Sequence, residues 1–137
     1  MISEKLFIDS DVLLDLFFDR RPYSQFTEKL FDIDLRNKFS LYTSSLVAAN
    51  LHYIISKQRN KKYASDCLET VLKFITILPL EGEAIQFGLR GEFDDFEDGL
   101  QYFTAKKNGC TAILSRNIKD YKHSSITVLS PEGYFKS

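Results

Sequence analysis

Acidic side chains gather in three stretches of this sequence that lie far apart along the chain. These stretches are FIDSDVLLDLF (residues 7–17), EFDDFEDGLQYFTA (92–105) and AILSRNIKDYK (112–122). Clustered carboxylates repel one another and resist joint ionisation unless a cation lies among them. Mg²⁺ and Mn²⁺ prefer such oxygen ligands, and a metal held this way binds a phosphate oxygen and lowers the pKa of a bound water. The stretches therefore predict metal-assisted chemistry on a phosphate ester.

The second stretch has more acids than helix capping requires. Asp95 and Asp98 are three residues apart and share one face of the predicted helix. A capping box, with Asp94 or Asp95 at the N-cap, is the alternative explanation. Capping uses two acids, whereas four of the five residues 94–98 are acidic. The composition of this stretch favours metal binding.

The first and third stretches are open to two interpretations each. Asp9 stands at the end of a predicted strand, and helix capping explains this acid as well as metal binding does. Ser115, Arg116 and Asn117 follow another predicted strand and precede Asp120, a composition equally typical of an ordinary turn. Arg116 is expected to contact a phosphate or to pair with a nearby carboxylate.

Other catalytic systems find little support in this sequence. The two cysteines, Cys67 and Cys110, predict buried small hydrophobic residues rather than a thiolate metal site or a disulfide scaffold. His52 and His123 stand apart from them, and the chain has no G-x-S-x-G nucleophile motif. No glycine loop of the phosphate-binding or dinucleotide-binding kind is present.

The composition describes one small domain in a reducing compartment. A chain of 137 residues with 44% hydrophobic residues predicts a single domain over 1–137 with a real core. Aspartates interrupt the first apolar stretch, so we expect no membrane span and a cytoplasmic location. The net charge of −1 provides no global basic field for nucleic acid, although bound cations would offset the local acidity.

The hydrophobic pattern predicts helices that alternate with short strands. Strands are expected at 5–9, 39–43, 75–78, 111–114 and 126–129. Helices are expected from Asp11, from a cap at Ser24 to about Arg36, from Ser44 or Ser45 to the basic loop KQRNKK, and over 63–74, 81–89 and 95–107. This order predicts an α/β fold, a three-layer α/β/α sandwich around a mainly parallel sheet of four to five short strands. Ligands bind such sheets at the carboxyl ends of the strands.

With these stretches placed, nearly the whole chain resembles the PIN-domain family, especially the small bacterial members that include VapC-type toxins. FIDSDVLLDLF resembles the opening D-T-N-hydrophobic motif, and DFEDGLQYFTA resembles a D-x-hydrophobic-x-x-A helix. LSRNIKDY resembles T-R-N-x-x-D-F, and ITVLSPEGYF resembles the closing strand and terminal helix. Each motif is loose alone, but the set is fairly specific in this order and at these spacings.

The resemblance implies an acidic Mg²⁺ or Mn²⁺ site, cleavage of single-stranded RNA, homodimers and often an antitoxin protein as partner. Asp9 and Asp98 then take the positions of the chief metal-binding acids, with Asp95 as a supporting acid. Two departures concern metal ligands. Asn50 stands where many members have Glu, and Asn117 where many have Asp, with Asp120 close by. Asn offers a carbonyl oxygen but no charge, which predicts weaker metal binding or a single ion.

We therefore predict a metal-dependent ribonuclease whose first or second ligand shell is drawn from Asp9, Asp98, Asp95, Asn50, Asn117 and Asp120. Ser10 is expected to bind substrate phosphate, and Arg116 to contact RNA. The main alternative is a catalytically weak PIN-like module that binds RNA or protein. A carboxylate-dependent phosphatase of another α/β fold is less favoured, because Val12-Leu13 follow Asp9-Ser10-Asp11 in place of a D-x-D-x-[TV] loop.

Overall fold

Five parallel strands form the centre of the molecule in a computed structural model that describes residues 4–35 and 37–136. The strands lie in the order β3-β2-β1-β4-β5, and every neighbouring pair is parallel. Their bounds are β1 Glu4–Ile8, β2 Phe39–Ser44, β3 Ile75–Leu78, β4 Ala112–Leu114 and β5 Thr127–Leu129. The predicted α/β sandwich with a parallel sheet is confirmed.

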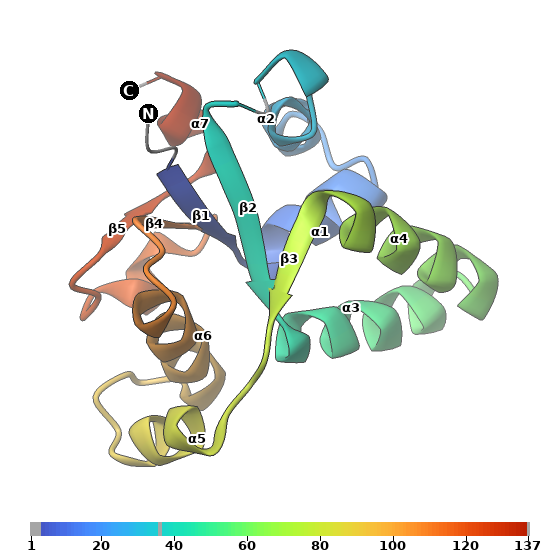
Figure 1. The fold of residues 1–137 in the computed structure, drawn as a ribbon. Coiled ribbons are helices and arrows are strands. Elements are labelled where there is room, and N and C mark those ends of the chain that lie inside the picture. Colours follow the sequence, from blue (N-terminus) through green and yellow to red (C-terminus); the bar gives the residue numbers. More distant parts are fainter. Residues whose placement is uncertain (1–3, 36, 137) are drawn as a thin grey trace.

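Seven α-helices connect and flank these strands in the described ranges. They are α1 Ser10–Phe17, α2 Tyr23–Leu30, α3 Ser45–Gln58, α4 Lys61–Phe74, α5 Gly82–Leu89, α6 Phe96–Lys107 and α7 Pro131–Lys136. Two short 3-10 helices, η1 (Ile33–Leu35) and η2 (Ile118–Tyr121), complete the elements. Figure 1 shows α3 and α4 as a long hairpin beside β3, with α5 and α6 near the carboxyl ends of the strands.

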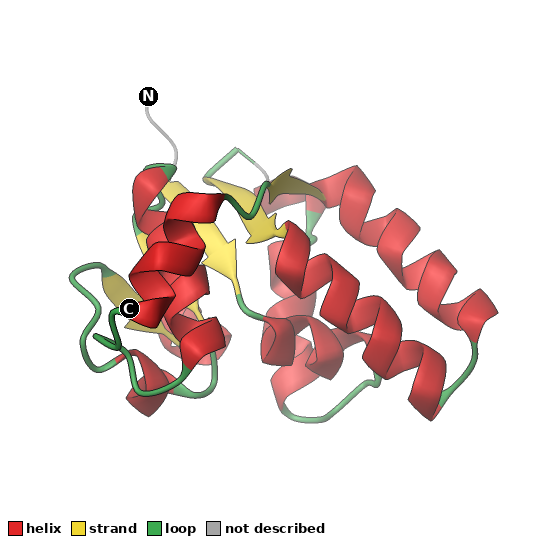
Figure 2. Cartoon of the chain, turned by 90° about the horizontal axis from the view of Figure 1, so that it is seen from below, coloured by secondary structure: helices red, strands yellow, loops and turns green. Residues whose placement is uncertain are grey.

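The alternation of side chains along β1 divides the core into two layers. Leu6 and Ile8 point into a cluster formed with α1 to α4, whereas Phe7 points into a second cluster with α5 and α6. Successive side chains of a strand face opposite sides of the sheet, so one strand supports both layers. Figure 2 shows the sheet between these helices.

The sequence located most elements to within two residues but was wrong about α2. Pro22, not Ser24, occupies the N-cap of this helix, and Ser24 is buried with its hydroxyl donating to Asp19 Oδ1 at 3.0 Å. The helix ends at Leu30, because the Asp32 side chain accepts from the backbone N of Asp34 and favours a tighter 3-10 turn. The predicted end at Arg36 lies outside the described residues.

The switch point of the sheet lies between β1 and β4. From β1 the chain adds β2 and β3 on one side of the sheet, and then returns to place β4 and β5 on the other. In open α/β sheets, ligands bind at such a switch point, outside the carboxyl ends of the strands, and we use the word crevice for this place in the fold. Asp9 follows β1 and Ser115 follows β4. No helix in the ranges 4–35 and 37–136 has both the length and the apolar character needed to cross a membrane.

Candidate functional site

The carboxylate of Asp9 lies at the switch point and is only 9% exposed. Asp9 is the N-cap of α1, and its Oδ1 accepts from the backbone N of Ser10 at 2.8 Å. Its Oδ2 accepts from the hydroxyls of Ser115 and Tyr121, each at 3.0 Å. Burial raises the pKa of Asp9, and these hydrogen bonds oppose that rise. The capping interpretation of Asp9 is therefore correct, and capping leaves this carboxylate facing the crevice.

Asp11, two residues further along, is a half-buried carboxylate that the sequence analysis did not place in the site. Its Oδ2 accepts from the backbone N of Arg116 at 2.9 Å, and the Ser115 hydroxyl lies 3.4 Å away. Its Oδ1 is buried and has no hydrogen-bond partner among the described residues. Burial and the neighbouring Asp9 raise the pKa of Asp11 to about 6. The D-x-D spacing across the strand–helix turn was the available signal for this acid.

Asp98 brings a third carboxylate from the first turn of α6. Burial raises its pKa to about 7, with further contributions from the nearby charges of Asp95, Asp9, Asp120 and Glu97. Asp120 also acts on Asp9. Acids from all three sequence stretches therefore lie close enough to repel one another. The convergence of Asp9, Asp98 and Asp120 agrees with the spatial arrangement expected from the sequence.

The other predicted residues lie around this group in different ways. Asp95 is the N-cap of α6 and accepts from the backbone N of Asp98 at 3.0 Å, so the capping alternative explains this acid. Asn50 lies partly exposed on α3 and donates from Nδ2 to Glu97 Oε1 at 3.3 Å. Ser10 is partly exposed at the start of α1. Asn117 is the N-cap of η2, and its backbone N donates to Ser115 Oγ at 3.1 Å.

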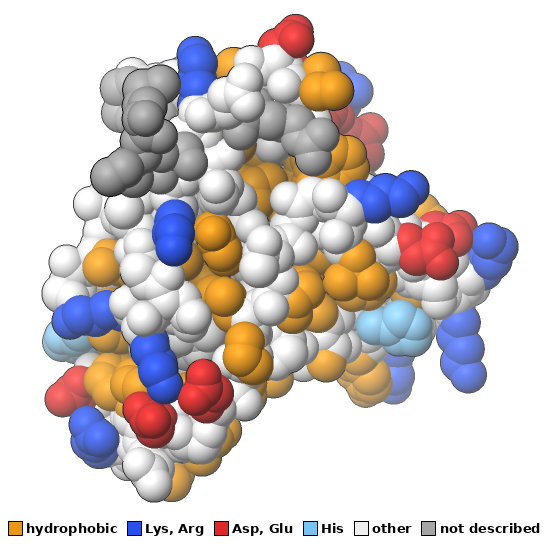
Figure 3. Space-filling view, viewed as in Figure 1, with side chains coloured by type: hydrophobic (Ala, Val, Ile, Leu, Met, Phe, Trp, Pro, Cys, Tyr) orange, Lys and Arg blue, Asp and Glu red, His pale blue; other side chains and the backbone are white. Residues whose placement is uncertain are grey.

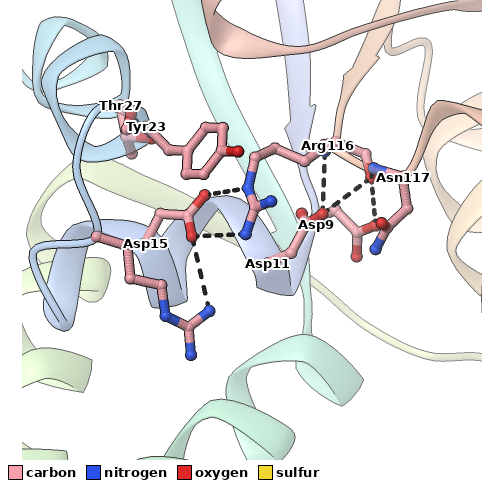
Figure 4. Close-up of polar contacts among 9 residues, drawn as sticks. Asp9, Asp11, Asp15, Tyr23, Thr27, Arg116 and Asn117 are labelled. Carbon is pink, nitrogen blue, oxygen red and sulfur yellow. Dashed lines mark hydrogen bonds and ion pairs between the residues drawn. The ribbon is translucent and has the colours of Figure 1, made fainter.

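Arg116 pairs with a carboxylate, one of the two roles left open for it. Its Nε and Nη2 donate to Oδ2 and Oδ1 of Asp15 at 2.6 and 2.9 Å (Figure 4). Asp15 is 1% exposed, and Arg20 Nη1 lies 3.6 Å from its Oδ1. Asp11 and Asp15 are four residues apart on α1, so Arg116 fastens the loop after β4 to two successive turns of this helix.

The donor set of this site fits a hard divalent cation. It consists of carboxylates whose pKa values are raised because like charges are buried together, and of one buried oxygen, Asp11 Oδ1, without a partner among the described residues. Mg²⁺ is commonly bound by one or two carboxylates together with waters. Within the described ranges, no three His, Cys, Asp or Glu side chains already surround a common metal position. The residues that could hold such an ion are Asp9 and Asp98, with Asp11 and Asp120 nearby.

Comparison with known proteins gives one family and a consistent set of relatives. The family model described as PIN domain matches residues 5–119. Over 139 residues the chain is 37% identical to Ribonuclease VapC1 of Aquifex aeolicus strain VF5, which covers 98% of this chain and 95% of that protein.

Two solved structures share the fold. One is VapBC2 of Rickettsia felis bound to a DNA fragment from their promoter, with a TM-score of 0.70, 19% identity, and coverage of 92% of this chain and 97% of that one. The other is a toxin-antitoxin complex of Klebsiella pneumoniae, with a TM-score of 0.68, 20% identity, and the same two coverages.

The first prediction concerns the pair formed by Asp15 and Arg116. Asp15→Asn removes the buried charge that two partly exposed arginines face, and a hydrogen bond to a charged group contributes about 1.5–3 kcal/mol. We expect the free energy of unfolding, measured in urea, to fall by about that amount. Asp66→Asn is the matched control, because Asp66 is 53% exposed in its ion pair with Lys62 and should change stability by less than about 1 kcal/mol. Equal effects of the two substitutions would contradict a structural role for Asp15.

The second prediction concerns pH in the absence of metal. The folded pKa values of Asp11 and Asp98, about 6 and about 7, lie above the ordinary carboxyl value, so between about pH 4 and 7 the folded state binds more protons than the unfolded state. Stability then falls as pH rises through this window. We expect the melting temperature in EDTA to be lower at pH 7.5 than at pH 5, and Asp98→Asn to reduce the difference. A difference that Asp98→Asn leaves unchanged would show that this carboxyl is not strained.

Proposed function

Because this chain belongs to the PIN-domain family, we propose that it is a metal-dependent endoribonuclease that hydrolyses phosphodiester bonds of RNA. One observation carries the proposal: acids from three distant stretches meet at the carboxyl edge of the sheet, where burial and the neighbouring charges raise the pKa values of Asp9, Asp11 and Asp98. Such an arrangement costs stability, and a bound cation would remove the cost. The relative that is 37% identical over nearly the full length is a ribonuclease by name, which supports RNA as the substrate.

In this proposal Asp9 and Asp98 are the chief ligands of a Mg²⁺ or Mn²⁺ ion. Asp120 and Asn117 approach from the loop after β4, and Asp95 and Asn50 support the site from α6 and α3. We add Asp11 to this set because its Oδ1 is buried without a partner among the described residues. A bound ion would supply a polarised phosphate oxygen and a water of lowered pKa.

The chain's own hydrogen bonds determine where the Asp9 carboxylate lies. Ser115 and Tyr121 donate to the same oxygen, Oδ2, while the backbone N of Ser10 occupies Oδ1. These three donors come from the loop after β4, from η2 and from α1, so the Asp9 side chain cannot rotate without breaking contacts to separate segments. Ser10, at the rim of the crevice, is placed to hydrogen-bond a substrate phosphate.

We also propose that residues 1–137 form a single domain, that it acts in the cytoplasm, and that it binds protein partners. We propose that the chain is the toxin of a toxin–antitoxin pair, supported by its likeness to a ribonuclease named VapC1 and by a fold shared with a chain of a toxin-antitoxin complex. A homodimer is supported by large exposed hydrophobic side chains on α5 and the start of α6, namely Ile85, Leu89 and Phe96. Leu89 is 74% exposed.

A weakly catalytic PIN-like module that binds RNA or protein is the second candidate. Asn50 and Asn117 favour it, because they offer uncharged oxygens where many members of the family have acids. Figure 3 adds that lysine and arginine side chains are scattered among acidic and hydrophobic ones on the face shown there. Binding of RNA through a broad basic surface would need a different distribution of charge on that face.

The third prediction is cleavage of RNA. The purified protein is expected to cut mixed cellular RNA with Mg²⁺ or Mn²⁺ and to lose the activity in EDTA. Asp98→Asn removes a ligand charge and should lower the rate by a factor of about 100 or more, whereas Asp66→Asn, on the exposed face of α4, should cut as well as the unaltered protein. An inactive protein that still binds RNA would favour the second candidate.

The fourth prediction concerns the missing acid at Asn50. This side chain is partly exposed and its Nδ2 donates to Glu97, so Asn50 is not a residue of the buried core. Asn50→Asp adds a carboxylate beside Glu97, so the melting temperature in EDTA should fall through repulsion. Mn²⁺ affinity, measured by calorimetry, should rise because ligand charge tunes oxygen sites.

The double variant Asn50→Asp, Glu97→Gln is the control for this prediction, because it moves the charge from α6 to α3 without adding any. It separates the effect of ligand position from that of total charge. Weaker Mn²⁺ binding in the Asn50→Asp single variant would remove Asn50 from the proposed site.

A further inference from the structure

A cavity of about 290 Å³ adjoins the carboxylate site on the side of α2 and α7. Its polar lining includes Asp15 and Arg116, and its apolar lining includes Tyr23, Phe26 and Ile118. We refer to it as the Arg116–Tyr23 cavity. The volume is near the lower end of small-molecule sites, about 300–1,000 Å³, and suits a single nucleobase.

Arg116 and Tyr23 form a stacked pair at this cavity. The guanidinium carbon lies 4.0 Å from the centre of the tyrosine ring, and Figure 4 shows the ring beside the guanidinium. Asp15 accepts from two of the five guanidinium N–H groups, and no other described residue accepts from this group. Arg116 therefore offers further N–H donors at a fixed position. They lie beside Tyr23, a residue that is 43% exposed.

The donors around the cavity favour an acceptor-rich ligand. Asp15 is shared between Arg116 and Arg20, and the carboxylate of Asp11 also acts on Arg116, so the cavity is distinguished by free N–H donors rather than by an excess of positive charge. Glu132 also lines the cavity, but its Oε1 accepts from Lys136 Nζ at 2.8 Å. An isolated anion would not need an exposed tyrosine ring, whereas a nucleotide uses both features, because a base stacks on aromatic rings and its edge accepts hydrogen bonds.

The cavity is joined to the carboxylate site through one residue. The backbone N of Arg116 donates to Asp11 Oδ2, and its side chain lines the cavity. Ser115, the preceding residue, donates to Asp9. An RNA strand whose phosphate binds a metal ion held by Asp9 would therefore pass along Arg116, which forms part of the cavity wall.

We propose that the Arg116–Tyr23 cavity binds the base of the nucleotide next to the scissile phosphate, and that it prefers guanine. Guanine presents two acceptors, O6 and N7, side by side on one edge, which is the pattern that arginine donors match best. The apolar lining, which includes Tyr23, Phe26 and Ile118, contributes affinity for any base, and Arg116 supplies the selection. The assignment rests on the ribonuclease proposed above, and it adds a specificity site to that function.

Two measurements test this assignment. First, ¹⁵N-labelled protein with Mg²⁺ is titrated with guanosine and cytidine 5′-monophosphates and followed by NMR. Shifts should gather at residues 23, 116 and 118, and the guanosine nucleotide should bind about tenfold more tightly. Second, cleavage of a randomised RNA pool should show a preference for guanine at one position beside the cut.

Tyr23 is the residue to alter, because its exposed ring can be changed without opening the core. Tyr23→Ala should weaken binding of the guanosine nucleotide and raise KM for RNA, each by a factor of about 10 to 100, with kcat within about twofold. Tyr23→Phe keeps the ring and should restore both values. Tyr53→Ala, at a tyrosine that is 61% exposed on α3, is the matched control and should change neither.

The outcomes separate this assignment from the proposed function. RNA cleavage that is indifferent to Tyr23→Ala, or equal binding of both nucleotides, would overturn the base site and leave the ribonuclease standing. Guanosine binding located at the cavity of a protein that cuts no RNA would overturn the ribonuclease and keep the nucleotide site. If neither nucleotide shifts the NMR signals of the cavity residues but a co-purified protein does, the cavity is a protein-binding site, and the assignment is overturned.

Discussion

The buried carboxylate of Asp9 is the constraint on which the rest of the site depends. A charged oxygen pair that is only 9% exposed must be surrounded by donors, because an ion taken out of water without partners is very costly. Three separate elements provide those donors, through the backbone N of Ser10 and the hydroxyls of Ser115 and Tyr121. Satisfying one carboxylate therefore fixes how the ends of β1 and β4 meet η2 at the switch point of the sheet.

The same site is strained by the charges that make it useful. Asp11 and Asp98 have raised pKa values because burial and neighbouring acids both disfavour their ionised forms. The fold tolerates this strain because the surrounding packing is extensive, with clusters of buried side chains on both faces of the sheet. An arrangement that costs stability and is retained in a well-packed domain is characteristic of functional sites, where a ligand offsets the cost.

Periodicity predicted the fold well, and strand ends predicted much of the site. Short apolar runs followed by polar residues located all five strands, and a parallel sheet brings strand ends to one edge, which predicted a site residue at Asp9. Asp98 follows no strand and was found from the excess of acids at the start of α6. Contacts between distant residues left no local signal. Tyr121 reads as an ordinary turn residue until the fold brings its hydroxyl to Asp9. Asp15 reads as a polar interruption of an apolar helix, although its spacing of four from Asp11 put both acids on one face.

Arg116 shows why a residue's type does not reveal its role. Its charge suggests direct binding of phosphate, yet Asp15 holds the guanidinium in two hydrogen bonds and Tyr23 stacks against it. An arginine fixed in this way loses little further entropy when it binds a ligand, whereas a free surface arginine must first be ordered. The structural pairing and a role in recognition are therefore compatible. The buried aspartate sets the direction of the guanidinium, and that direction decides which ligand atoms its remaining N–H groups can reach.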